Sequence, residues 1–140
     1  MDFSFFNRPV LKKITSGGPP ALAEPARRAV EGILQQLPDL LMTYVADVAT
    51  GSILAAYTSH RDYNPNQVSL RNARIFARLA DALAGKPWLG GPVQDLTVVL
   101  DDQLHHLRVC RGGKQYCFVA VLTAEANLGI VKTIVNQHAP

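Results

Sequence analysis

The sequence predicts an α+β domain in which helices cover both faces of one mainly antiparallel sheet. Helix-like runs, with apolar residues three and four apart, alternate with pairs and triplets of short strand-like runs. The run from Phe118 to Leu122 is apolar at every position, as in strands that are covered on both faces. A strand of this kind lies centrally in its sheet with helices above and below, which predicts a three-layer α/β/α sandwich.

Apolar spacing and turn residues place eight elements along the chain. Pro25 and Pro38 bound the first helix, Gly51 lies in the turn of the first hairpin, and Gly85 ends the longest helix. The expected elements are a helix at 25–37, strands at about 41–48 and 52–58, a helix at about 67–84, strands at 95–101, 104–111 and 114–123, and a helix at about 125–137.

Residues 1–22 are expected to form an N-terminal extension to a single domain at 23–138. The extension ends in SGGPP, a composition that continues neither a helix nor a strand. Its apolar anchors are Phe3, Phe5 and Phe6. This composition leaves two interpretations open. The extension is either a tail that packs on the domain or a short segment that docks on a partner.

The composition narrows the possible partners and locations. Of 140 residues, 48% are apolar and 18% charged, and the net charge is +3. That surplus comes from residues 1–30, which hold five basic and two acidic side chains (5 − 2 = +3), so the remainder is neutral. A neutral domain lacks the basic face of nucleic-acid-binding proteins, and no nucleic-acid partner is expected. We also expect no membrane span and, without a secretory signal, a cytoplasmic protein.

The stretch DDQLHHLRVCRGGKQYC, at 101–117, raises the question of a metal site. Gly112 and Gly113 indicate a two-residue hairpin turn. The resulting register pairs Cys110 with Gln115, Val109 with Tyr116, and Arg108 with Cys117.

The hairpin register argues against metal binding. His105 and His106 then point to opposite faces of the sheet. His106 and Cys110 lie about 13 Å apart at roughly 3.3 Å per residue, whereas zinc ligands converge to within about 2.3 Å of the ion. Cys110 and Cys117 are diagonal neighbours, so reduced thiols are expected rather than a disulfide.

The sequence contains no convincing catalytic motif. The residues SHRD at 59–62 lie in a polar loop, whereas a catalytic triad is assembled from separate elements. Asp101 and Asp102 fit a solvated turn, and GKP at 85–87 lacks the spacing of a phosphate-binding loop. Trp88 is interpreted as a lid over the core. We therefore expect no enzymatic activity.

The order of elements, together with the stretches YVADVATGSILAAYT, LTVVLDDQLHHLRV and YCFVAVLTAEANLGIVKTIV, resembles the Roadblock/dynein light chain family, in its bacterial type, over about residues 24–138. The resemblance includes the polar first turn from Asp47 to Gly51. It also includes a penultimate apolar strand that runs into a last helix, with Asn127, Leu128, Gly129 and Val131 in the matching motif.

This resemblance implies a profilin-like sheet of five strands in the order 2-1-5-4-3. The first and last helices would lie on one face and the middle helix on the other. It also implies a homodimer, in which the third strands pair edge to edge and the middle helices pack together. Here Asp95, Thr97 and Val99 would form the dimer edge, and pairing would protect a flat apolar strand from aggregation.

Members of this family are non-catalytic platforms for protein partners, among them small Ras-like GTPases, and the resemblance implies no cofactor. Arg71, Arg74 and Arg78 follow three- and four-residue steps along the middle helix. They would form a face for an acidic partner or for the dimer mate, with a solvated basic face as the alternative. The long GKPWLGGPVQD loop departs from the family pattern.

A second function class is a small-molecule sensor of the PAS or profilin-like kind. Its ligand would lie between the sheet and the long helix, near Tyr44, Tyr57, Phe76 and Phe118. No polar groups clearly converge on such a pocket in the sequence, although ligand sites usually contain a few.

Overall fold

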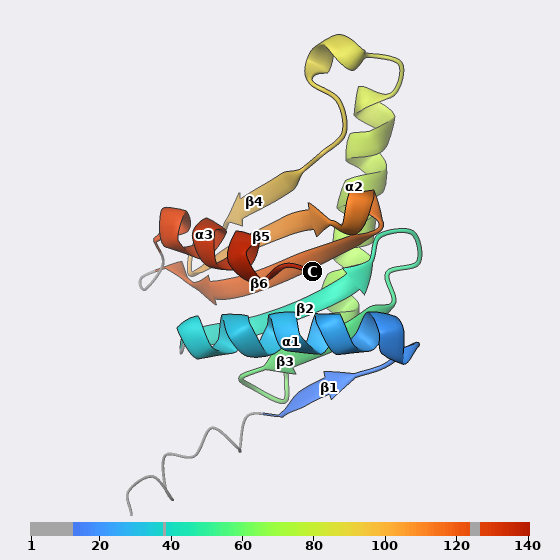
Figure 1. The fold of residues 1–140 in the computed structure, drawn as a ribbon. Coiled ribbons are helices and arrows are strands. Elements are labelled where there is room, and N and C mark those ends of the chain that lie inside the picture. The colour runs from blue at the N-terminus through green and yellow to red at the C-terminus, as the bar shows by residue number, and fades with distance from the viewer. Residues whose placement is uncertain (1–12, 38, 124–126) are drawn as a thin grey trace, which may run out of the picture.

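The chain folds into one antiparallel sheet with helices on both faces (Figure 1). The computed structural model describes residues 13–37, 39–123 and 127–140. Its elements are β1 (Ile14–Ser16), α1 (Pro20–Gln36), β2 (Leu40–Asp47), β3 (Ile53–Thr58), α2 (Pro65–Leu83), a 3₁₀ turn η3 (Pro87–Leu89), β4 (Asp95–Val99), β5 (Gln103–Cys110), a turn η4 (Arg111–Gly113), β6 (Gln115–Leu122) and α3 (Leu128–His138).

The sheet has six strands rather than the expected five, in the order β1-β3-β2-β6-β5-β4. The five expected strands keep their expected relative order, and the complete order differs because β1 is added beside β3. The β5–β6 register is the one expected, with Cys110 opposite Gln115 and Arg108 opposite Cys117. β6 occupies the centre, and its residues are buried except Leu122, which is 40% exposed where the strand ends.

The first helix begins at Pro20 and not at Pro25. Proline is accepted at this position because the first N–H groups of a helix have no partner within it. The expected boundary between residues 22 and 23 therefore falls inside α1. Of the expected extension, β1 pairs with the β3 residues Ala55 to Tyr57, while Phe3, Phe5 and Phe6 lie outside the described residues.

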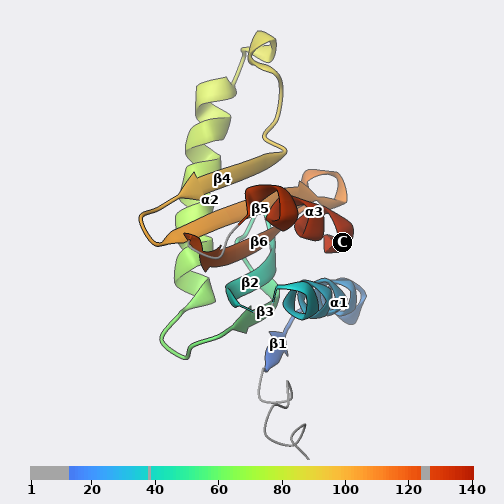
Figure 2. The same ribbon diagram turned by 90° about the vertical axis from the view of Figure 1, so that its left-hand side faces the viewer.

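Two apolar cores lie on opposite faces of the sheet. The larger joins α1 and α3 to the sheet, and the smaller lies under α2 around Tyr44, Tyr116 and Phe118. The helices are thus distributed as the resemblance implied. α2 crosses the strands and continues beyond β4, the outermost strand on that side (Figures 1 and 2). Among the described residues, no helix has the length and apolar character needed to cross a membrane.

Candidate interaction surface

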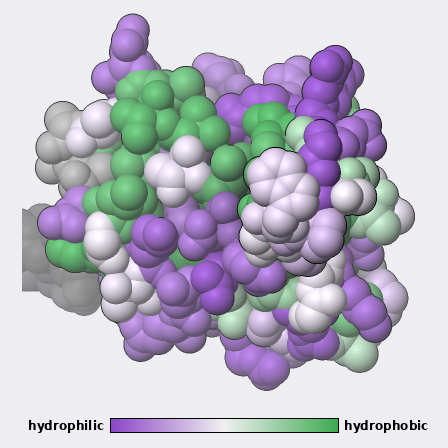
Figure 3. All heavy atoms as spheres, turned by 90° about the horizontal axis from the view of Figure 1, so that it is seen from above, coloured by the Kyte–Doolittle hydropathy of each residue, from purple (hydrophilic) through white to green (hydrophobic). Residues whose placement is uncertain are grey.

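The outer edge of β4 pairs with no other strand in the described part of the chain. β4 alternates its side chains, so Leu96 and Val98 face the α2 side while Asp95, Thr97 and Val99 face the α3 side. Val99 is 66% exposed, and apolar side chains gather around this edge when the molecule is viewed from above (Figure 3). An exposed apolar edge strand is a pairing surface.

The three expected edge residues have distinct local contacts. The Asp95 carboxylate lies 3.7 Å from both Arg108 Nη1 and Lys132 Nζ. Thr97 Oγ1 lies 2.8 Å from Nδ1 of the buried His106. These contacts hold the side chains of Asp95 and Thr97 against the α3 face of the sheet. The parts of β4 that remain open to a partner are therefore its backbone edge and the exposed side chain of Val99.

The second half of α2 is an apolar surface without full cover. The two buried residues of the helix, Ser69 and Asn72, both lie in its first half. Beyond them, Ile75, Phe76, Leu79 and Leu83 are only half-buried. A groove of about 720 Å³ runs between this part of the helix, the loop that follows it and the β5–β6 turn; its apolar walls include Val48, Phe76, Leu83, Val93 and Val109.

A chain of buried hydrogen bonds attaches the first half of α2 to the sheet. Asn72 Nδ2 donates to the Tyr44 hydroxyl at 2.8 Å, which lies 2.6 Å from the Tyr116 hydroxyl. Ser69 Oγ donates to the Gly51 carbonyl at 2.7 Å. Burial, then the neighbouring Tyr116, raises the pKa of Tyr44, which therefore stays a neutral hydroxyl. The position of α2 is thus set by directional polar contacts.

The expected arginine face of α2 divides into two parts. Arg74 and Arg78 are exposed. Arg71 is half-buried, and its Nη2 donates to Asn72 Oδ1 at 3.0 Å and to His105 Nδ1 at 3.0 Å. Arg71 therefore helps to hold the helix on the sheet, whereas the structure shows only that Arg74 and Arg78 are exposed.

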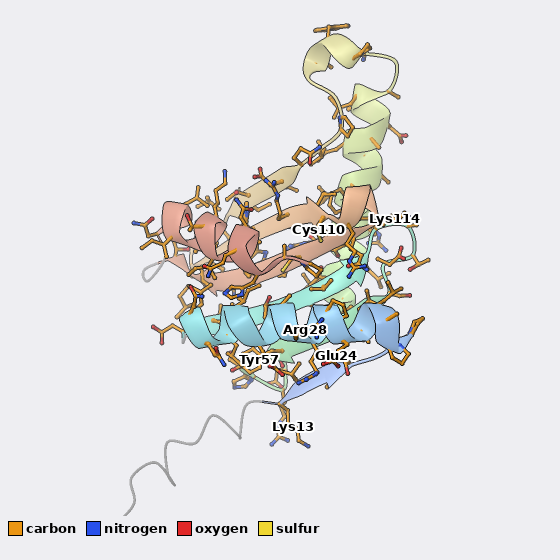
Figure 4. The ribbon with its side chains drawn as sticks, viewed as in Figure 1. Lys13, Glu24, Arg28, Tyr57, Cys110 and Lys114 are labelled. Carbon is orange, nitrogen blue, oxygen red and sulfur yellow. The ribbon has the colours of Figure 1, made fainter. Side chains whose placement is uncertain are left out.

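The histidine and cysteine residues considered as metal ligands lie apart. His105 faces α2, and His106 is buried on the other face against Thr97. Cys110 lies near the β5–β6 turn close to Lys114 (Figure 4), and both cysteines are free. Burial raises the pKa of Cys110 to about 11 and raises that of Cys117 as well. No cluster of three or more metal-ligating side chains occurs among the described residues.

The residues considered for catalysis or ligand binding do not converge either. His60 and Asp62 lie in an exposed loop with Nδ1 and Oδ2 3.5 Å apart, and Asp101 and Asp102 are exposed in a turn. For the sensor hypothesis, Tyr44 and Phe118 stack at 5.0 Å between ring centroids and fill the core under α2. Tyr57 belongs to the opposite core, near Lys13 (Figure 4), so the four aromatic residues do not line one cavity.

Sequence reasoning was wrong about Trp88. The indole is 78% exposed at the tip of the loop after α2 and covers no core. A signal was present, because PWLGG places a tryptophan between proline and two glycines, a turn composition that projects from the fold. Gly90 and Gly91 indeed adopt positive φ angles of 108° and 89°, which glycine accepts without strain.

Comparisons with known proteins agree with this geometry at the level of the fold. MglB from Myxococcus xanthus superposes with a TM-score of 0.63 at 9% identity, over 84% of this chain and 88% of that one. A Roadblock/LC7 domain from Streptomyces avermitilis gives 0.63 at 16% identity, over 79% and 92%. The gliding protein MglB from Thermus thermophilus gives 0.64 at 19% identity, over 81% and 84%.

No family model matches the sequence, and no curated protein matches it. The structural matches nevertheless confirm the resemblance that the sequence indicated: the chain has the fold of bacterial Roadblock-domain proteins.

Proposed function

We propose that this chain is a non-catalytic regulator that forms a homodimer through β4 and binds a small Ras-like GTPase in the cytoplasm. The observation that carries the dimer is the outer edge of β4, which no strand of the described residues covers, beside the projecting half of α2. The second half of α2 is only half-buried and extends beyond β4 (Figure 1), so a partner that pairs with β4 would also reach the helix. A second copy, related by a two-fold axis, would supply both a pairing strand and an apolar face.

The regulatory role is supported by the fold, which this chain shares with a gliding protein and a Roadblock/LC7 domain. The GTPase is the partner class that the sequence resemblance implied. The exposed Arg74 and Arg78 on α2 provide the surface proposed for it.

A single substitution on the edge tests the dimer. If Thr97 lies near the two-fold axis of two antiparallel β4 strands, Val99 of one copy lies opposite Asp95 of the other. Val99→Asp would then place two carboxylates together in a desolvated interface, and we expect it to yield monomers that remain folded. Light scattering coupled to size exclusion measures the result against twice 15.2 kDa for the parent.

Ala21→Asp is the matched control, because Ala21 is exposed in the first turn of α1, away from β4. This variant should remain dimeric. A parent protein that is monomeric at micromolar concentration would contradict the proposal, as would a Val99→Asp variant that pairs as well as the parent.

The small-molecule sensor remains the second candidate. The groove of about 720 Å³ beside Phe76 favours it, since its walls are mainly apolar. An apolar dye tests the two uses of this groove. Binding that persists in the dimer and is abolished by Phe76→Ala would support the sensor. Loss of dye binding on dimerisation would indicate that the second copy fills the groove.

A further inference from the structure

The loop after α2 presents an unusual exposed surface. Trp88 is 78% exposed and Leu89 is 45% exposed, side by side at its tip. Exposed tryptophan leaves a large apolar area in water, and tryptophan is prominent among the residues that dominate protein interfaces. The tip stands beyond β4 at the end of the α2 projection (Figure 1).

The direction of the strands determines what a second copy would place near this loop. The loop and the end of α2 lie with Val93 and Val109 at the end of the sheet where β4 begins and β5 finishes. Antiparallel pairing of two identical β4 strands reverses the partner. The loop of one copy is therefore next to the partner's opposite sheet end, where β4 finishes and β5 begins.

That opposite end carries exposed apolar side chains. Leu100 is 42% exposed and Leu122 is 40% exposed. Both lie beside Gln103, since Leu100 N donates to the Gln103 carbonyl at 2.8 Å and Leu122 is the strand partner of Gln103. Gln103 also lines a pocket of about 210 Å³ on the α2 side, walled by Met42, Val68, His105, Phe118 and Ala120 among others.

We propose that Trp88 of one copy packs on Leu100 and Leu122 of the partner subunit, at the mouth of this pocket. Two such contacts, one at each end of the joined edges, would fix the register of the β4 pair. The inference rests on the proposed dimer and adds to it a specific anchor. Because the contact needs the indole of one subunit and the two leucines of the other, it would also restrict dimerisation to chains that carry both.

Intrinsic fluorescence tests the contact directly, because Trp88 is the only tryptophan of the chain. In the dimer we expect emission at shorter wavelength and weaker quenching by acrylamide than in the Val99→Asp monomer. Leu122→Ser should return the quenching towards that of the monomer in samples that light scattering shows to be dimeric.

Truncation of the indole provides a second readout. Trp88→Ala should raise the dimer dissociation constant roughly 30-fold, the factor that corresponds to about 2 kcal/mol. Ile130→Ala, which removes another exposed apolar side chain, on α3, should change it little. A stable dimer whose Trp88 is quenched as freely as in the monomer would overturn the contact and leave the dimer intact. A protein that never dimerises would overturn both proposals.

Discussion

His105 and His106 are neighbours in sequence, yet each belongs to a different hydrogen-bonding environment. A guanidinium can only donate, so His105 Nδ1 accepts from Arg71, and Nε2 is left to donate to Gln103 Oε1 at 2.8 Å. This arrangement requires a neutral imidazole. Burial, and then the charge of Arg71, lowers the pKa of His105 to about 4, and burial lowers that of His106 too.

These shifts predict that the protein loses stability in mild acid. Both histidines titrate near 6.5 when the chain is unfolded, so below that pH the unfolded state binds protons that the folded state does not. The stability present above about pH 6.5 is lost as the pH falls towards 4. For His105 alone the loss is roughly 2 kcal/mol at about pH 5.

Urea denaturation at about pH 7.5 and about pH 5 measures this loss. His105→Gln should reduce the difference between the two conditions, whereas His60→Gln, in the exposed loop, should leave it unchanged. Equal stability at the two pH values would show that the histidines are not held neutral.

At the scale of elements, β1 shows how a few residues can cover the edge of a sheet. It is only three residues long, yet it covers the edge of β3, where Ala55, Ala56 and Tyr57 are buried. A chain that begins at Gly17 should lose roughly 1 to 2 kcal/mol of stability with the strand's hydrogen bonds. It should also associate beyond the proposed dimer, because the edge of β3 would become available for pairing.

Light scattering over a range of concentrations, together with denaturation, measures both effects. Thr15→Pro, which cannot donate to the ladder, should reproduce them in the full-length chain. A truncated chain that remains strictly dimeric would show that the β3 edge needs no cover.

Periodicity predicted the long elements of this fold because each buries one face over several turns or strand repeats. The long helix expected at about 67–84, which is α2 (Pro65–Leu83), the hairpins at Gly51 and at Gly112–Gly113, and the central position of β6 follow from that pattern. β1 was not predicted because a strand of three residues is too short to show a repeat. The residues SGGPP were interpreted as a linker, but they contain the end of β1 and the start of α1. The projection of α2 depends on where the helix crosses the sheet, and no local pattern in its sequence encodes that position.

The candidate surface was predictable only in part, because local sequence patterns do not encode contacts between distant segments. The edge residues of β4 followed from the resemblance, and Arg74 and Arg78 are exposed as the helical spacing indicated. Arg71 has the same spacing, but its guanidinium donates to Asn72 and to His105. The contact with His105 joins segments far apart in sequence, so helical spacing does not reveal it. Trp88 was misjudged because large apolar residues are usually covered by the chain that carries them.

At the scale of the whole molecule, the two proposed surfaces should be separable. The dimer would use the β4 edge and the apolar side of α2, while the exposed Arg74 and Arg78 would face an acidic partner surface. Charges at the rim of an interface mainly set the association rate and the choice of partner. The double variant Arg74→Glu/Arg78→Glu should therefore remain dimeric by light scattering and bind a small Ras-like GTPase of the same cell roughly tenfold or more weakly.

Surface plasmon resonance with the GTPase in its GTP-bound and GDP-bound forms measures this affinity, and the difference between variant and parent should shrink as salt screens the charges. Arg28→Glu reverses one exposed arginine on α1, on the opposite face of the sheet, which is half the charge change of the α2 variant, and it should bind as the parent does. If Arg28→Glu weakens binding and the α2 variant does not, the partner docks on the α1–α3 face. The basic residues of α2 would then be a solvated surface, and the regulator would present its partner on the side away from the projecting helix.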